Sequence, residues 1–316
     1  MNKRRSFIVG ISSTKLLPSE RTFIKRYKPW VVILFTRNIK SINQTKILTS
    51  SIRKIFNDDK YPILIDQEGG KVNRLKNFIS FDNLTSEFFG KKFINNKREF
   101  IIYYKLFIDK TSFLLKAMGI NINTSPVLDL RIKGTSNIIG DRSFSNNPKV
   151  VSQIGDHCIK YFQQNGIGTV IKHIPGHGLA NLDSHKSLPI VNKSLNYLLN
   201  NDFKCFKNNN SHFAMTAHVL FNHIDKTNCA THSKKIINNI IRKKLGYKGI
   251  IISDDINMKA LKYEIVESAI KAIDAGCNLA LYCKGNYRDS LKLLKKIPPI
   301  DAFTSKKTSE FYKFLG

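Results

Sequence analysis

Short apolar runs alternate with longer amphipathic stretches along the whole chain, and this alternation constrains the fold more than any other feature. The apolar runs have the length and composition of buried strands, at 7–11, 31–35, 63–66, 120–124, 169–172, 213–216, 249–253 and 279–282. Apolar positions recur at helical spacing between many of them, as in 42–56, 150–164, 233–245 and 264–275. Gly166, Gly246 and Gly276 stand where helices should end before a strand.

Eight strands with interposed helices predict a single (β/α)8 TIM barrel, an α/β fold. An open doubly wound sheet is the alternative, but no Gly-rich dinucleotide or phosphate fingerprint follows the first strand. We find no linker, internal repeat or low-complexity segment in the 316 residues. The expected organisation is therefore one catalytic barrel domain over residues 1–316.

Polar residues stand at the ends of four predicted strands, and in a barrel these ends share one face. Asp66 and Glu68 follow the third strand, Lys172-His173 ends the fifth, Thr216-Ala-His218 ends the sixth and Ser253-Asp254-Asp255 ends the seventh. Charged groups are costly to bury without partners. Their concentration at strand ends therefore indicates an active site.

The segment 172–185 is the richest in proton-transfer groups, with three His, one Asp and one Lys among turn-forming residues. Asp183 stands two residues before His185, and a carboxylate near an imidazole raises the pKa of the imidazole, which suits a general acid/base. From the spacing alone, a surface turn that binds nothing is an equal alternative. His173 and His177 are four apart, a spacing that binds metal only on a helix. Pro175 and Gly176 prevent a helix there, so we predict no metal site.

Asp254 follows an apolar run, where a carboxylate can act as nucleophile, base or metal ligand. We expect its neighbour Asp255 to cap the next helix, which leaves Asp254 available for chemistry. Asp66 with Arg74, and the turn Gly140-Asp-Arg142, are Asp/Arg pairs. Such a pair can bind neighbouring sugar hydroxyls, or it can be a turn held by an ion pair.

The chain resembles the β-N-acetylhexosaminidases of glycoside hydrolase family 3 in the order and approximate spacing of its motifs. These are Asp66-Gln-Glu-Gly-Gly-Lys-Val-Asn-Arg74, Gly140-Asp-Arg-Ser-Phe144, Lys172-His-Ile-Pro-Gly-His-Gly178, Asp183-Ser-His185 and Ile252-Ser-Asp-Asp255. The resemblance covers nearly the whole chain. It departs mildly at Lys71, where Arg is common, and at Leu179-Ala180, where an Asp-Thr pair is frequent.

The resemblance implies a role for each site residue. Asp254 is the nucleophile, and His185 is the acid/base with Asp183 as its partner. The terminal sugar is held by Asp66, Arg74, Arg142, Lys172 and His173.

The implied activity is that of a retaining exo-β-N-acetylglucosaminidase that needs no cofactor. It would remove terminal GlcNAc from peptidoglycan fragments such as GlcNAc-1,6-anhydro-MurNAc peptides during muropeptide recycling. Phosphorolysis by the same residues is the alternative, because a neutral imidazole repels an anionic acceptor less than a carboxylate does.

Two other classes of protein stay open. A metal-dependent amidohydrolase on the same barrel would want His-x-His at the first strand end, where Ile11-Ser-Ser13 stands. A nucleic-acid-binding protein would explain the formal charge of +29. Lys is, however, spread along the chain with Asn and Ile, which AT-rich codons would produce, and we therefore predict no specific nucleic-acid partner.

The remaining composition bears on location. The N-terminal apolar run 7–11 is too short for export or for crossing a bilayer. Five Cys without a CxxC pair suggest a reducing compartment. We expect a cytoplasmic monomer without a membrane partner, acting on a small-molecule muropeptide.

Overall fold

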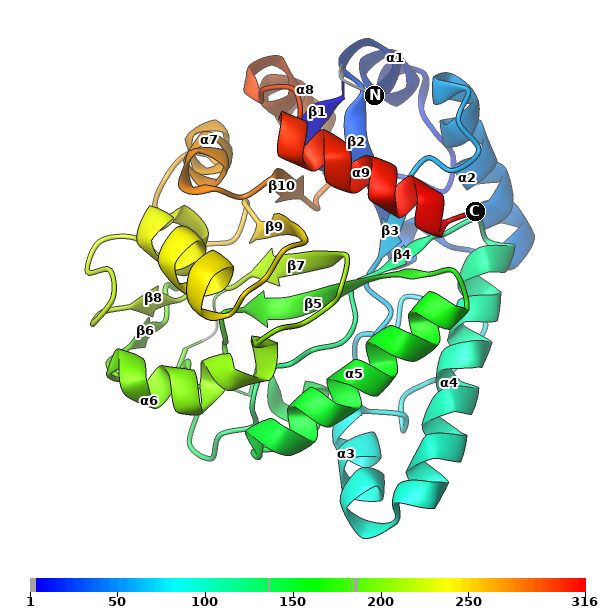
Figure 1. The fold of residues 1–316 in the computed structure, drawn as a ribbon. Helices are drawn as coiled ribbons and strands as arrows, with labels where there is room; N and C mark the ends of the chain where they lie inside the picture. The colour runs from blue at the N-terminus through cyan, green and yellow to red at the C-terminus, as the bar shows by residue number, and fades with distance from the viewer. Residues whose placement is uncertain (1–3, 136, 183, 185–186) are drawn as a thin grey trace.

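In the computed structural model, which describes residues 4–135, 137–182, 184 and 187–316, eight parallel strands of these residues close into a barrel (Figure 1). The strands follow one another around the barrel as β1 (Arg5–Gly10), β2 (Pro29–Leu34), β3 (Ile63–Ile65), β4 (Ile122–Asn123), β5 (Gly168–Ile174), β7 (Phe213–Thr216), β9 (Ile250–Asp255) and β10 (Leu279–Tyr282). Each overlaps one of the predicted runs. The predicted (β/α)8 barrel is therefore confirmed.

Helices surround the barrel and connect its strands (Figure 1). They are α1 (Pro18–Tyr27), α2 (Ile42–Phe56), α3 (Ser86–Asn95), α4 (Lys97–Ala117), α5 (Pro148–Gln164), α6 (Leu195–Asn200), α7 (Ile265–Ala275), α8 (Tyr287–Lys296) and α9 (Ala302–Phe314), with a π-helix, η5 (Lys235–Lys244). Short 3₁₀ turns are η1 (Thr36–Asn38), η2 (Gly140–Arg142), η3 (Asp202–Phe206) and η4 (Ala230–His232). The four helices predicted from apolar spacing correspond to α2, α5, η5 and α7. Gly276 ends α7 in a left-handed conformation with φ 116°, as its position before a strand predicted.

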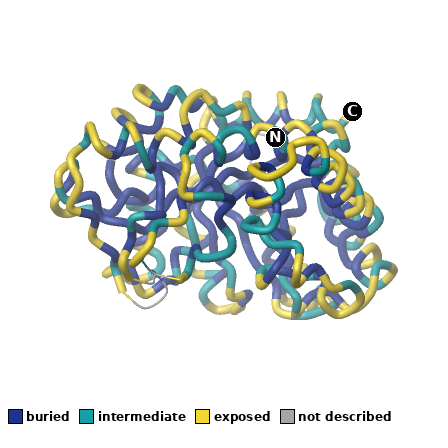
Figure 2. Tube along the Cα trace, turned by 90° about the horizontal axis from the view of Figure 1, so that it is seen from below, coloured by how far each residue is buried: buried dark blue, intermediate teal, exposed yellow. Residues whose placement is uncertain are grey.

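The core has two layers, one inside the barrel and one between the barrel and its helices. Figure 2 shows the buried chain through the middle of the molecule, with exposed residues at its periphery. The C-terminal helix α9 packs against the first residues of the strands: the ring of Phe311 lies 5.1 Å from that of Phe213, and Trp30 Nε1 donates to Thr308 Oγ1 at 2.9 Å. Helix α9 therefore closes the N-terminal end of the barrel, and polar side chains gather at the opposite end.

A second, two-stranded parallel sheet pairs β6 (Ile190–Val191) with β8 (Leu220–Phe221). This sheet joins the chain that follows the His-rich segment 172–185 to the chain that follows β7. Each strand has only two residues, which is too short to show a period in the sequence.

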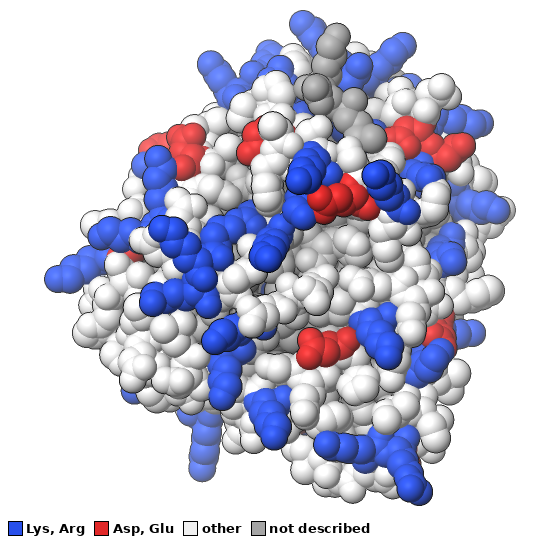
Figure 3. All heavy atoms as spheres, viewed as in Figure 1, with Lys and Arg blue, Asp and Glu red and all other residues white. Residues whose placement is uncertain are grey.

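Basic side chains are spread over the face seen in Figure 3, with acidic residues between them. No helix within the described residues is long and apolar enough to cross a membrane.

Candidate active site

The C-terminal ends of β3, β4 and β5 bring together a network of buried charges around Lys172. Lys172 Nζ lies 2.6 Å from Glu68 Oε1, 3.3 Å from Asp66 Oδ1 and 2.8 Å from Thr124 Oγ1. Thr124 also donates to Asp66. The Lys172 side chain is only 3% exposed, so its charge depends on these partners rather than on water.

Two arginines complete this network. Arg142 grips Glu68 through two hydrogen bonds, Nε to Oε2 at 2.8 Å and Nη2 to Oε1 at 2.9 Å. Arg74 Nη2 lies 3.3 Å from Asp66 Oδ2. Burial alone would raise the pKa of both carboxyls, but Arg142 and Lys172 lower that of Glu68 to about 2, and Lys172 and Arg74 hold that of Asp66 well below its ordinary range. Both carboxylates are therefore ionised at neutral pH, and each is held by at least two cationic or hydroxyl partners.

His173, at the end of β5, is oriented by a carboxylate that lies outside the motif series. Asp129 Oδ2 lies 2.6 Å from His173 Nδ1, and the backbone N–H groups of His173 and His177 both donate to Asp129. Asp129 is completely buried. Burial would raise its pKa, but His173 and His177 lower it. Asp129 therefore fixes the backbone at both His173 and His177.

Asp254 and Asp255 end β9, and their carboxyls have opposite environments. Burial would raise the pKa of Asp254, but His218, His173 and Lys172 hold it below its ordinary value. Burial and the charge of Asp254 raise the pKa of Asp255 to about 6, although its Oδ1 accepts N–H groups of Asn257 and Cys283. The expectation that Asp255 caps the next helix is wrong, because α7 begins at Ile265 after Glu264. Asp255 instead braces the turn that follows its own strand.

The predicted acid/base pair, Asp183 and His185, lies outside the described residues. Ser184, between them in the sequence, is 2% exposed. Its hydroxyl lies 3.3 Å from His177 Nε2, and its carbonyl accepts the N–H of Ala260, in the turn after β9. The chain at Ser184 is thus attached both to the His-rich segment and to the turn that follows Asp254.

Another buried carboxyl, Asp202, lies against the His-rich segment at Gly176 and Gly178. Cβ atoms added at Gly176 or Gly178 would approach its oxygens to 2.5 and 2.9 Å, so the backbone can lie this close only at glycine. The backbone N–H groups of Leu130, Gly178 and Leu179 lie near its oxygens, but among the described residues none of them has the geometry of a hydrogen bond to Asp202. Burial and the charge of Asp129 raise the pKa of Asp202 to about 8, which makes it a neutral acid at pH 7.

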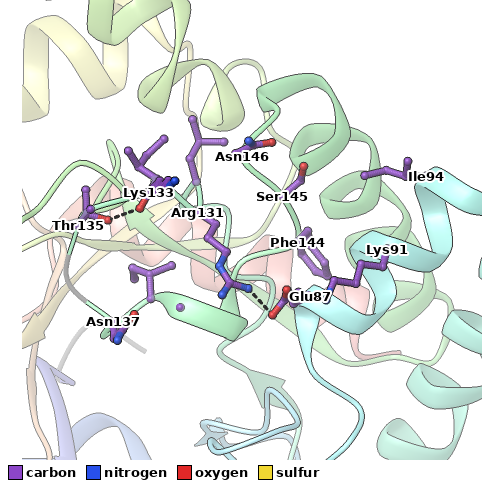
Figure 4. A pocket seen from close by; sticks show the side chains of 15 residues that line it. Glu87, Lys91, Ile94, Arg131, Lys133, Thr135, Asn137, Phe144, Ser145 and Asn146 are labelled. Carbon is purple, nitrogen blue, oxygen red and sulfur yellow. Dashed lines mark hydrogen bonds and ion pairs between the residues drawn. The ribbon is translucent and has the colours of Figure 1, made fainter.

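A cavity of about 480 Å³ lies between α3 and the chain at 130–135 and 137–146 (Figure 4). Leu130 and Gly140, which line it, are sequence neighbours of Asp129 and of the Arg142 turn. Arg131 forms an ion pair with Glu87 across the cavity.

Within the described residues, no group of three or more His, Cys, Asp or Glu side chains is arranged to hold a metal ion.

The structure brings together six of the eight predicted site residues: Asp66, Arg74, Arg142, Lys172, His173 and Asp254. The prediction missed Asp129, Thr124 and Asp202. Thr124 and Asp129 do follow the fourth strand, in Asn123-Thr-Ser-Pro-Val-Leu-Asp129, so strand-end position could have found them. Asp202 follows no barrel strand and had no such signal.

Comparison with known proteins identifies the family of the chain. Residues 10–300 match the family described as the glycosyl hydrolase family 3 N-terminal domain. A β-hexosaminidase of Hydrogenovibrio crunogenus is 31% identical over 281 residues, which cover 87% of this chain and 78% of the relative. That of Alkalilimnicola ehrlichii is 32% identical over 305 residues, 93% of this chain and 84% of the relative.

Solved structures are similar over almost the whole chain. NagZ from Neisseria gonorrhoeae in complex with N-trifluoroacetyl-D-glucosamine superposes with a TM-score of 0.87 at 28% identity, covering 99% of this chain and 90% of that one. A family 3 β-N-acetylglucosaminidase from a Paenibacillus species gives 0.84 at 27%, covering 98% of this chain and 60% of that one. The chain therefore belongs to glycosyl hydrolase family 3 and is a glycoside hydrolase.

Proposed function

We propose that this enzyme is a retaining exo-β-N-acetylglucosaminidase that releases terminal GlcNAc from peptidoglycan fragments. The names of its β-hexosaminidase and β-N-acetylglucosaminidase relatives support the sugar. The fragments, and a place in muropeptide recycling, follow from the motif resemblance. One observation carries the mechanism: Asp254 is held ionised at a strand end, within the electrostatic influence of Lys172 and His173, which belong to the sugar-binding cluster.

In the proposed first step, a carboxylate oxygen of Asp254 attacks the anomeric carbon as the glycosidic bond breaks. His185 gives its proton to the departing oxygen, and a covalent glycosyl-enzyme forms. In the second step His185 takes a proton from water, whose oxygen displaces Asp254 and returns it as the carboxylate. Two inversions give net retention.

The sugar-binding roles are assigned to Asp66, Arg74, Arg142, Lys172 and His173. The Asp66 carboxylate can accept hydrogen bonds from sugar hydroxyls. The three N–H donors of Lys172 face Glu68, Asp66 and Thr124, so Lys172 can donate to a sugar hydroxyl that replaces one of these contacts. Because these groups are already held by one another, little conformational freedom is lost when the sugar binds. Asp183 is assigned to orient His185 and to stabilise its protonated form.

Trapping of the intermediate tests the mechanism. A slow fluorinated GlcNAc donor should leave a sugar adduct on the peptide that contains Asp254, seen as a mass shift. Asp254→Asn should abolish both the adduct and nearly all turnover. The matched control is Asp255→Asn, which removes the neighbouring carboxyl and should still form the adduct on Asp254.

The acetamido group of the substrate could itself attack the anomeric carbon, with Asp254 and Asp255 orienting it. Absence of an adduct together with tight binding of a thiazoline analogue would establish that route and refute the covalent mechanism. Analysis of products with and without phosphate separates hydrolysis from phosphorolysis.

A further inference from the structure

Asp129 holds both ends of the turn 173–177 with one carboxylate. Its Oδ1 accepts the N–H of His177 at 2.8 Å and that of His173 at 3.2 Å. Its Oδ2 accepts the His173 N–H at 3.1 Å and also lies 2.6 Å from the ring Nδ1. A clamp for the backbone needs only the amide contacts, so the short contact with the ring adds something further.

The ring contact determines which nitrogen of His173 carries a proton. An ionised carboxylate can only accept, so Nδ1 must donate and therefore carries hydrogen. The other nitrogen, Nε2, makes no hydrogen bond to any of the described residues. In the neutral ring Nε2 is then an acceptor for a hydroxyl group, at a place where Asp254 and Lys172 lie close enough to interact electrostatically.

We propose that Asp129 is a positioning residue for the reaction, which fixes His173 with Nδ1–H bound and Nε2 presented to the terminal sugar. This rests on the proposed function, because a sugar hydroxyl is what Nε2 would contact. Asp129 itself does not touch the substrate.

Asp225 offers a matched comparison within the same chain. It is also a buried carboxylate that braces a turn, accepting N–H groups of Thr227 and Asn228 and the hydroxyl of Ser233. It makes no hydrogen bond to an imidazole among the described residues. Asp225→Asn therefore removes a similar clamp without changing the environment of His173.

The first test uses the free, unmodified enzyme. Long-range ¹H–¹⁵N spectra of protein labelled with ¹⁵N-histidine report which ring nitrogen is protonated, and His173→Gln identifies the signals by their loss. We expect Nδ1–H for His173 at a pH where the ring is neutral. An Nε2–H tautomer there would overturn the proposal, whether or not any variant folds.

The second test measures catalysis in folded variants. Asp129→Asn keeps the shape but loses the charge, and we expect kcat/KM for a GlcNAc β-glycoside to fall roughly 10- to 100-fold, as on loss of the carboxylates that orient metal-ligating histidines. GlcNAc should also bind more weakly, which raises its inhibition constant, and the His173 signals should show a mixture of tautomers. Asp225→Asn should change kcat/KM by less than about twofold, since it touches no site residue.

Equal losses of kcat/KM in the two variants would reduce Asp129 to a structural clamp and refute its positioning role. Failure of the proposed function has a different signature. In that case the wild-type enzyme would cleave no GlcNAc β-glycoside, while the tautomer of His173 in the free enzyme would still be Nδ1–H.

Discussion

Replacing Glu68 by Gln tests how strongly the cations of the site depend on one buried carboxylate. Glu68 meets Lys172 at 2.6 Å and Arg142 through two hydrogen bonds, and its side chain is 4% exposed. Its pKa falls from the ordinary 4.5 to about 2, because Arg142 and Lys172 outweigh burial. At about 1.4 kcal/mol per pH unit, this contributes about 3 kcal/mol to the free energy of unfolding. Removing one partner of a buried ion pair costs about 3–5 kcal/mol in other proteins, which agrees.

The pH dependence gives the prediction its sign. The pKa of Glu68 is depressed in the folded state, so its contribution is complete above pH 4.5 and is lost as pH falls toward 2. Urea unfolding should therefore show Glu68→Gln less stable than wild type by about 3 kcal/mol at pH 7, with the gap closing in acid. Glu87→Gln is the control, because its partly exposed ion pairs with Lys91 and Arg131 are screened by water. A gap below about 1 kcal/mol, or one that stays constant with pH, would refute the reasoning.

Three further predictions concern other parts of the enzyme. The raised pKa of Asp202, about 8, means that the folded state keeps a proton that the unfolded state loses near pH 4. Between these two pH values, the free energy of unfolding of Asp202→Asn should rise relative to that of wild type by about 1.4 kcal/mol per pH unit. A difference between the two proteins that does not change with pH would contradict this. His185→Ala should slow substrates with poor leaving groups far more than activated aryl glycosides; equal losses would remove His185 from the acid role. Turnover of a neutral substrate should change little between low and moderate salt if the charge of +29 has no functional partner, and a steep loss would revive the nucleic-acid interpretation.

The barrel was predictable because its strands are buried on both sides. Such strands read as short, continuous apolar runs, and all eight could be located, including β4, which is only two residues long. The β6–β8 pair was not predicted, since its contacts depend on how two distant segments meet. Helix α9 was missed for a similar reason: its buried side, which includes Phe311, faces the end of the barrel, a surface that exists only after the barrel closes.

The site followed the same division. Strand-end position identified Asp66, Lys172, His173 and Asp254, because parallel strands deliver their last residues to one face. Position could not show that Glu68 would be shared between Arg142 and Lys172, since residues far apart in the sequence supply the partners. For Asp255 the local prediction was wrong. A helix cap must stand directly before its helix, but α7 begins only at Ile265.

The carboxyls of the site fall into two kinds, and their difference supports the proposed roles. Glu68 and Asp254 lie near cations, and their pKa values are lowered despite burial. Asp202 and Asp255 lie near other carboxylates, and their pKa values rise to about 8 and about 6. Where the pKa values of neighbouring carboxyls are separated in this way, the carboxyl with the lower pKa is the better candidate for a role that needs a carboxylate. Asp254 and Asp255 are adjacent in sequence, yet only Asp254 has a pKa below its ordinary value, because His218, His173 and Lys172 outweigh its burial.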